Sequence, residues 1–206
     1  MTDPHVVTDP DALQALYGTP MITSLAKVVD HVHPLYAPFI EKAPFAVLAT
    51  VGPNGLDTSP RGDGPGFIEI ADPKTLLLPD RRGNNRIDTL RNVILDPRIA
   101  LLFLVPGVGE TLRVNGEAEV TLDPALLERF AVEGKQPRSV LRIHVKSVFF
   151  QCARALARSK LWEPDTRIDR KALPSTGTIL DVLSKHQIDG EQYDRELAPR
   201  QKETLY

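Results

Sequence analysis

The densest group of polar side chains in this 206-residue sequence lies in the run Pro79-Asp-Arg-Arg-Gly-Asn-Asn-Arg86. Its three arginines carry guanidinium groups that suit phosphate, and its two asparagines tolerate unusual backbone angles. The run lies between an expected strand end and an expected helix start, with Asn84 or Asn85 as the N-cap. A helix N-terminus offers unpaired N–H groups to an anion. By spacing alone, an anion site and a solvated turn are equally consistent, because the run lacks the glycine pattern of a nucleotide-binding loop.

Three other groups of side chains could take part in the same chemistry. Arg61 ends an expected strand beside a glycine-rich loop. Thr111 and Arg113 share the polar face of an alternating strand, where a polar ligand could lie across them or an acidic neighbour could pair with the arginine. Basic residues precede Trp162, whose ring could stack on a flat ligand or pack over the edge of the sheet. Taken one at a time, each group favours a surface or packing role.

Other catalytic chemistries have no matching motif. His31 and His33 are two residues apart on an expected helix, so they point in different directions and do not form a metal pair. Cys152 has no histidine at an informative spacing and is expected to be a small packed residue. The sequence contains no Gly-x-Ser-x-Gly, His-Glu-x-x-His or paired-cysteine motif, so hydrolase and metal-enzyme interpretations lack support.

Composition excludes several further classes. The formal net charge is −2, which disfavours a protein that binds duplex nucleic acid. A single cysteine excludes an internal disulfide. The sequence has no apolar run of about 18 residues, so no membrane span is expected. The first four residues lack an export signal, and we therefore expect a cytoplasmic protein.

The elements that would position these side chains are mostly short strands. The first 44 residues have helical spacing, and a helix over residues 23–42 should kink or divide at its two prolines. A helix over residues 85–96 is expected between the fourth and fifth strands. The seven expected strands cover residues 45–51, 57–61, 67–70, 75–78, 99–105, 111–120 and 140–150. This pattern predicts a mainly β fold with flanking helices, built on a small antiparallel barrel. We expect a helical extension over residues 1–44, the barrel over 45–163 and a C-terminal extension over 164–206.

Several segments together resemble the flavin-binding split barrel of the pyridoxamine 5′-phosphate oxidase superfamily. The resemblance covers about residues 20–163, and the order and spacing of the pieces are more specific than any one piece. The matching pieces are Pro44-Phe-Ala-Val-Leu-Ala-Thr50, Ser59-Pro-Arg-Gly-Asp63, Thr75-Leu-Leu-Leu-Pro-Asp-Arg81, Gly83-Asn-Asn-Arg86, Leu90-Arg-Asn92, Asp96-Pro97, Leu102-Phe-Leu-Val-Pro-Gly107, Thr111-Leu-Arg-Val-Asn-Gly116, Phe150-Gln-Cys-Ala-Arg154 and Arg158-Ser-Lys-Leu-Trp162.

The resemblance implies an antiparallel FMN-binding split barrel that forms a homodimer, with two FMN molecules in clefts between the subunits. It also implies three groups of cofactor-binding residues. The phosphate group would be held by Arg61, Asn85 and Arg86, with Ser59 also in contact with the cofactor. The flavin ring would lie against Asp80 and Arg81, and Thr111, Arg113, Arg158, Ser159 and Trp162 would meet the cofactor from across the cleft.

The expected function is an FMN-dependent oxidoreductase acting on an unidentified small molecule, with oxygen or a nicotinamide nucleotide, NAD(P)H, as the second reactant. Vitamin B6 oxidases hold their substrate phosphate with an arginine–histidine motif after a tryptophan. Here Glu163 follows Trp162 and no histidine occurs before His186, which argues against pyridoxamine phosphate as the substrate. The alternatives are a non-catalytic FMN-binding protein for storage or redox sensing, a deazaflavin-dependent reductase, and a barrel without flavin that serves only protein interaction.

Overall fold

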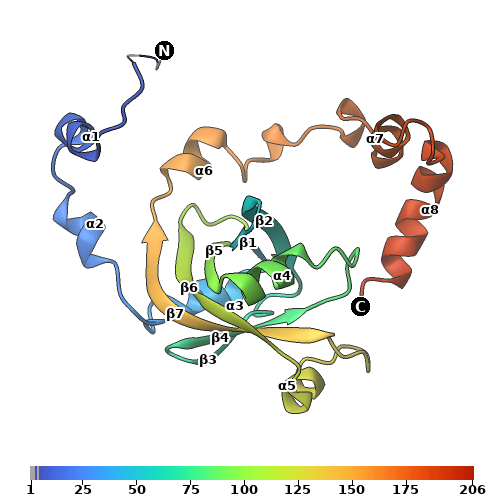
Figure 1. Ribbon diagram of the computed structural model, residues 1–206, viewed down its shortest axis with the longest axis horizontal. Coiled ribbons are helices and arrows are strands. Elements are labelled where there is room, and N and C mark those ends of the chain that lie inside the picture. Colours follow the sequence, from blue (N-terminus) through green and yellow to red (C-terminus); the bar gives the residue numbers. More distant parts are fainter. Residues whose placement is uncertain (1–2, 4) are drawn as a thin grey trace.

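Seven antiparallel strands form a single curled sheet in the computed structural model, which describes residue 3 and residues 5–206 (Figure 1). The strands are β1 (Phe45–Gly52), β2 (Gly55–Gly62), β3 (Glu69–Asp72), β4 (Thr75–Asp80), β5 (Arg98–Leu104), β6 (Thr111–Thr121) and β7 (Ser139–Gln151). Their order in the sheet is β2-β1-β5-β6-β7-β4-β3. The expected seven strands and antiparallel barrel are therefore confirmed. The expected absence of an export signal concerns residues 1–4, of which 1, 2 and 4 lie outside the described residues.

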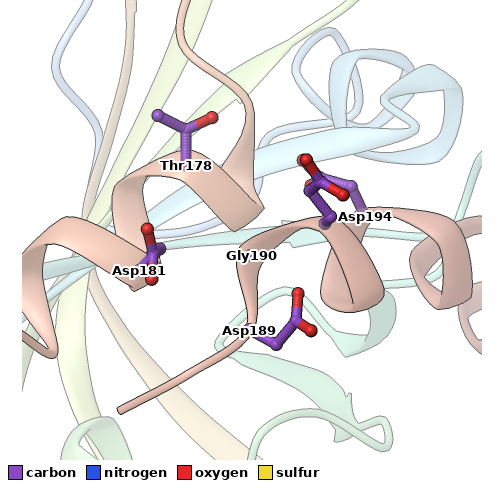
Figure 2. A pocket seen from close by; sticks show the side chains of 6 residues that line it. Thr178, Asp181, Asp189, Gly190 and Asp194 are labelled. Carbon is purple, nitrogen blue, oxygen red and sulfur yellow. The ribbon is translucent and has the colours of Figure 1, made fainter. Parts of the chain in front are cut away.

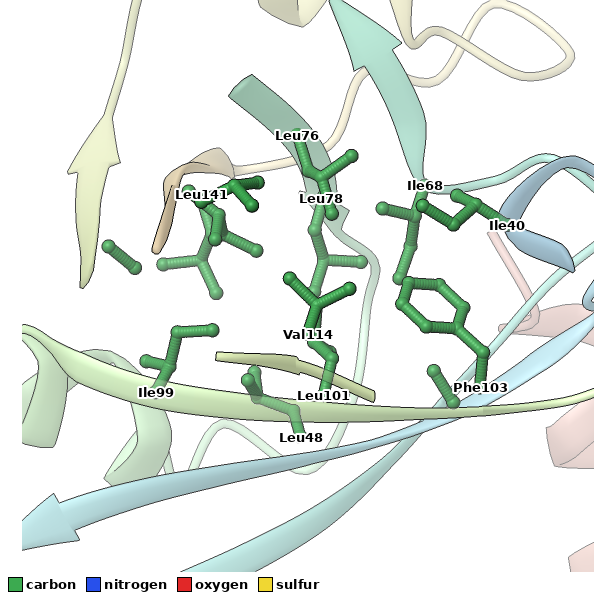
Figure 3. Close-up of a cluster of buried hydrophobic side chains, with 14 of the residues drawn as sticks. Ile40, Leu48, Ile68, Leu76, Leu78, Ile99, Leu101, Phe103, Val114 and Leu141 are labelled. Carbon is green, nitrogen blue, oxygen red and sulfur yellow. The ribbon is translucent and has the colours of Figure 1, made fainter. Parts of the chain in front are cut away.

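The core lies inside the curl of the sheet, where alternate residues of the strands point inward. In β1 the buried positions alternate from Ala46 through Leu48, and in β5 they alternate through Leu101 and Phe103. Figure 3 shows side chains from several strands meeting there, together with Ile40 from a short helix. Ile40 is 1% exposed, so this helix closes one side of the barrel interior.

The alternation expected along β6 is present, but the pairing of β6 with β7 is interrupted once. β7 carries an extra residue, because Asn115 pairs with Ser147 while Gly116 pairs with Val145. Such a bulge bends the strand that carries it and increases the local twist. The bend helps a sheet of long strands to curl into a barrel.

One helix lies between the fourth and fifth strands, as expected, and the others flank the sheet. The helices are α1 (Pro10–Tyr17), α2 (Ile22–Ala26), α3 (Ala37–Lys42), α4 (Asp88–Leu95), α5 (Pro124–Arg129), α6 (Arg154–Ser159), α7 (Thr176–Leu183) and α8 (Gly190–Glu203), with short 3-10 turns at Pro164–Thr166 and Arg170–Ala172. The helix expected over residues 23–42, with a kink or division at its two prolines, is divided into α2 and α3, and the ten residues between these helices are not helical. Val29 forms an extended bridge to Val148 of β7, so the chain pairs with the sheet after α2 and becomes helical again only at α3.

The helices near both ends of the chain lie outside the barrel (Figure 1), although the C-terminal residue Tyr206 returns to it and contacts Asp63. Neither α1 nor α2 contains a buried residue, and α7 and α8 form a separate hairpin at the other side of the barrel. The division at residues 44 and 163 remains a prediction. Within the described residues, no helix combines the length and apolar character needed to cross a membrane.

Candidate functional site

An ion pair connects the two halves of the sheet where the barrel is open. Arg61 lies near the end of β2, the first strand in the sheet order, and Asp80 ends β4, the last but one. The Nη1 atom of Arg61 donates to Oδ1 of Asp80 at 2.8 Å. Their side chains are 19% and 17% exposed, so water screens the pair only in part. The sheet therefore curls far enough to bring these two predicted residues together.

A second ion pair runs beside the first. Arg81 Nε donates to Oδ2 of Asp63 at 2.9 Å, and Arg81 Nη1 donates to the Phe130 carbonyl at 2.6 Å. The hydroxyl of Tyr206 donates to the other oxygen of Asp63 at 2.6 Å. Burial raises the pKa of the Asp63 carboxyl, but the hydrogen bonds from Tyr206, Gly64 N–H and Arg81 outweigh it, and the net pKa is lowered. Asp63 is thus held in its charged form.

The start of α4 lies later in the chain than the sequence indicates. Neither Asn84 nor Asn85 is the N-cap. Ile87 takes that position with a φ of 51°, and no side chain caps the helix. Asn84 accepts a hydrogen bond from Arg86 N–H instead, and Asn85, with a φ of 62°, accepts one from Arg138. Because side chains leave the first N–H groups of α4 free, this end of the helix can receive an anion.

Two hydrogen bonds hold α4 against β2, the strand that carries Arg61, and against the neighbouring strand β1. The hydroxyls of Ser59 on β2 and Thr89 on α4 are 3.2 Å apart. Asn92 Nδ2 donates to Thr50 Oγ1 on β1 at 3.1 Å. A Cβ added at Gly52 would lie 2.2 Å from Oδ1 of Asn92, so only glycine permits this approach. The first turn of α4 is therefore fixed beside Ser59.

These residues leave one polar atom without a partner. Nε of Arg61 is buried and forms no hydrogen bond within the described part of the chain. A buried donor without an acceptor costs about 1–3 kcal/mol, which a ligand oxygen would recover. The unpaired donor, the free start of α4 and the two hydroxyls fit a phosphate group. Arg86 is 77% exposed and pairs with Asp88, so it lies at the rim and is free to turn toward an anion.

The other predicted residues form a separate group on β6 and around α6. Arg113 is exposed, and its guanidinium lies 4.8 Å from the ring centre of Phe149. Trp162 Nε1 donates to the Val108 carbonyl at 2.8 Å, which fixes the indole to the loop between β5 and β6. Thr111 is 9% exposed, and Arg158 and Ser159 lie on the exposed part of α6. Among the described residues, no hydrogen bond or ion pair joins this group to the one around Arg61.

Sequence reasoning missed Thr89, Tyr206 and Arg138. Thr89 was detectable in principle, because it follows Arg86 by three residues and so falls in the first turn of a helix that starts nearby. Tyr206 and Arg138 are far from Asp63 and Asn85 in sequence, and no local pattern indicates these contacts.

One cavity lies outside this region. It has a volume of about 370 Å³ and lies between α7 and α8. Figure 2 shows that its labelled side chains include Asp181, Asp189 and Asp194. Carboxylates repel a phosphate, so this cavity does not suit a phosphate-bearing cofactor. In the part of the chain that the structure describes, no group of three or more His, Cys, Asp and Glu side chains is arranged to hold a metal ion.

The curled antiparallel sheet and the basic cluster at its open edge define a split-barrel protein. A family model described as pyridoxamine 5′-phosphate oxidase matches residues 32–152, which is more than half of the chain. The protein belongs to this family of flavin-binding proteins. The matched residues include both ion pairs, all of α4 and β6, but not α6 or Trp162.

Several solved structures are similar to this chain at low sequence identity. Two crystal structures of HupZ from Group A Streptococcus, one of them a variant, match with TM-scores of 0.50 and 0.48 and identities of 19% and 21%. They cover 58% and 64% of this chain and 99% and 95% of HupZ. A protein from Clostridium acetobutylicum related to general stress protein 26 matches with a TM-score of 0.44 and 15% identity, over 55% of this chain and 83% of its own. A search of curated proteins finds no match.

Proposed function

We propose that this protein binds FMN beside Arg61 and is an FMN-dependent oxidoreductase that acts on a small molecule. The observation that carries the proposal is the buried Nε of Arg61, which has no partner within the described residues and lies on the strand that α4 contacts. An FMN phosphate carries two negative charges and many acceptor oxygens, so it would satisfy this donor. Family membership makes a flavin the expected ligand, and the phosphate fit favours FMN.

One group of residues would bind the phosphate end of the cofactor, and another would contact its ring. Ser59, Arg61, Thr89 and the first N–H groups of α4 would hold the phosphate, and Arg86 would turn in from the rim. Asp80 would remain paired with Arg61, which fixes the guanidinium plane. Arg81 would face the ring region. When bound, FMN would supply hydride or electron transfer, and the protein would orient it and exclude water.

A homodimer would complete the site. Arg113 and Trp162 are fixed on other elements and form no contact with the Arg61 group within the described chain, so a second copy would have to bring its own pair across the cleft, together with Thr111, Arg158 and Ser159. Large apolar side chains are exposed on the N-terminal arm, where Leu16, Tyr17 and Ile22 are 75%, 80% and 75% exposed. Apolar surface of this kind commonly marks an interface between proteins.

The test starts with the purified protein and its visible spectrum, with any released cofactor identified by mass. Titration with FMN, FAD and a deazaflavin then compares the three ligands. Tight binding of FMN alone supports the proposal, and no binding of any of them contradicts it. Reduction of the bound flavin by NADH or NADPH, followed by reoxidation by a substrate, supports an enzyme. Bound flavin that is not turned over with any donor supports the alternative of a storage or sensing protein. Light scattering after size-exclusion chromatography measures whether a dimer forms.

A further inference from the structure

The segment over residues 163–206, which we call the strap, runs along the outside of the barrel and is fixed to it at its two ends (Figure 1). Just before the strap begins, Trp162 donates to the Val108 carbonyl at 2.8 Å. At the far end, the Tyr206 hydroxyl donates to the Asp63 carboxylate at 2.6 Å. Within the described residues, every hydrogen bond and ion pair that the strap forms between these ends is local. The strap is therefore a long segment with two attachment points.

Apolar packing contributes little to holding the strap against the barrel. Its large apolar side chains include Leu173, Val182 and Leu183, which are 55%, 60% and 77% exposed. The helices α7 and α8 pack against each other, and in each of them only a glycine is buried. Burial of apolar surface is the dominant favourable term in folding and association, so a strap without it depends on its polar contacts.

The polar contacts of Tyr206 are made with the second ion pair of the candidate site. The hydroxyl binds one oxygen of Asp63, and Arg81 Nε donates to the other oxygen at 2.9 Å. The Arg81 guanidinium also lies 5.6 Å from the centre of the Tyr206 ring, within the range of a cation–π contact. A hydrogen bond to an ionised acceptor is about twice as strong as a neutral one. These contacts suffice to dock the strap, and a segment held by so few contacts can open locally.

Docking of the strap affects the candidate site through Arg81, the side chain that we assign to the flavin ring region. Tyr206 and Arg81 also line a cavity of about 150 Å³, so the departure of Tyr206 would expose this side of the site to solvent. We propose that the strap, docked by Tyr206 on Asp63, encloses the ring end of the bound cofactor and slows its release. The inference rests on the proposed function and extends it to a segment that lies outside the family match over residues 32–152.

Distance measurement by pulsed electron resonance tests docking in the full chain without FMN. The single cysteine, Cys152, is exposed and takes one spin label, and Gln201→Cys provides an exposed position for the second label on α8. An excess of unlabelled protein restricts the signal to distances within one chain. We expect a narrow distance distribution in the otherwise unsubstituted protein and a broad one in Tyr206→Ala. The matched control, Leu205→Ala, shortens an exposed neighbouring side chain and should keep the distribution narrow.

The rate of FMN release from the same variants tests the effect on the cofactor. Rapid dilution of the loaded protein, followed by the recovery of FMN fluorescence, measures this rate. Tyr206→Ala should release FMN at least about fivefold faster, the lower end of typical coupling between two sites. Tyr206→Phe keeps the ring and loses the hydroxyl, so its rate should lie between those of Tyr206→Ala and the unsubstituted protein. Leu205→Ala should stay within about twofold of the unsubstituted protein, because no coupling is removed.

Three results would overturn the inference. A broad distribution in the protein that retains Tyr206 would mean that the strap is not docked. An equally narrow distribution in Tyr206→Ala would mean that other contacts hold the strap. Equal release rates despite a broadened distribution would mean that docking does not act on the cofactor. A protein that binds no flavin would contradict the proposed function, and with it the effect on release, while the distance measurement would still decide whether Tyr206 docks the strap.

Discussion

Arg61 and Asp80 form an ion pair of 2.8 Å between strands at nearly opposite ends of the sheet order. No backbone hydrogen bond joins β2 to β4 in the described sheet, so this contact is made by side chains alone. The pair therefore does two things: it links the edge strand β2 to β4 near the other end of the sheet, and it orients the guanidinium that we assign to the FMN phosphate. A substitution at Arg61 should affect stability and cofactor binding together, and a second substitution can separate the two effects.

Arg61→Ala should weaken FMN binding by about 1–3 kcal/mol, because a charged hydrogen-bond partner is lost. It should also destabilise the fold by about 1–3 kcal/mol, since Asp80 is then left mostly buried and unpaired. The double variant Arg61→Ala/Asp80→Ala should recover much of the stability without recovering the affinity. Urea unfolding and titration of flavin fluorescence measure the two quantities.

The control for this prediction is Arg142→Ala. Arg142 pairs with Glu119 across β6 and β7, where both partners are more exposed. Exposed pairs contribute about 0–1 kcal/mol, so neither stability nor affinity should change much. If Arg61→Ala keeps full FMN affinity, the phosphate assignment is wrong.

Arg86→Ala should weaken FMN binding by about 1–3 kcal/mol and leave the stability nearly unchanged. Arg86 is 77% exposed and pairs with Asp88, two residues further on. Arg98 provides a close match at the other end of α4, since it is 70% exposed and pairs with Asp96, two residues earlier. Arg98→Ala should therefore leave FMN affinity unchanged, and equal losses in both variants would point to a general charge effect.

The sequence predicts the strands well because burial inside a barrel imposes alternation, which is visible along β1, β5 and β6. It also indicates Arg61 and Asp80 through their places at strand ends. The partnership between them depends on how far the sheet curls, and no local pattern encodes that curl. The helix over residues 23–42 is interrupted over a longer stretch than its two prolines predict. Helical spacing of apolar residues is present there, but the backbone of Val29 pairs with Val148 of β7 instead. The predicted start of α4 is wrong because Asn84 uses its side chain in a local turn and Asn85 uses its side chain to accept a hydrogen bond from Arg138, so neither caps the helix.

Gly116→Ala should destabilise the protein by about 3 kcal/mol or more, because the backbone cannot move aside. A Cβ at this position would lie 2.4 Å from the carbonyl oxygen of His144, across the bulge between β6 and β7. Gly83→Ala is the control, since its added Cβ meets nothing within 4 Å and its φ is compatible with alanine. Thermal unfolding of both variants tests this, and a Gly116→Ala protein as stable as the control would contradict the close strand approach.

Tyr206→Phe should lower the stability at neutral pH, and the loss should disappear toward both ends of the pH scale. The hydrogen bond to Asp63 helps hold the pKa of that carboxyl below its ordinary value of 3.8 and raises the pKa of the Tyr206 hydroxyl above 10.0. A lowered carboxyl pKa contributes stability that is present above 3.8 and is lost as the pH falls through the folded-state pKa. A raised hydroxyl pKa contributes stability that is present below 10.0 and is lost as the pH rises through the folded-state pKa.

The difference in unfolding free energy between the unsubstituted protein and Tyr206→Phe should therefore be greatest between these two limits. Urea unfolding across the pH range measures it, and NMR titration of the Asp63 carboxyl should show its pKa rise in the variant. Arg81 and the Gly64 N–H still bind the carboxylate, so the rise should be partial. Tyr193→Phe serves as the control, because Tyr193 lies on α8 against Arg200 and its hydroxyl has no hydrogen-bond partner within the described residues. A pH-independent loss in Tyr206→Phe would show that the tyrosine contributes by packing alone and that the hydrogen bond to Asp63 is not made.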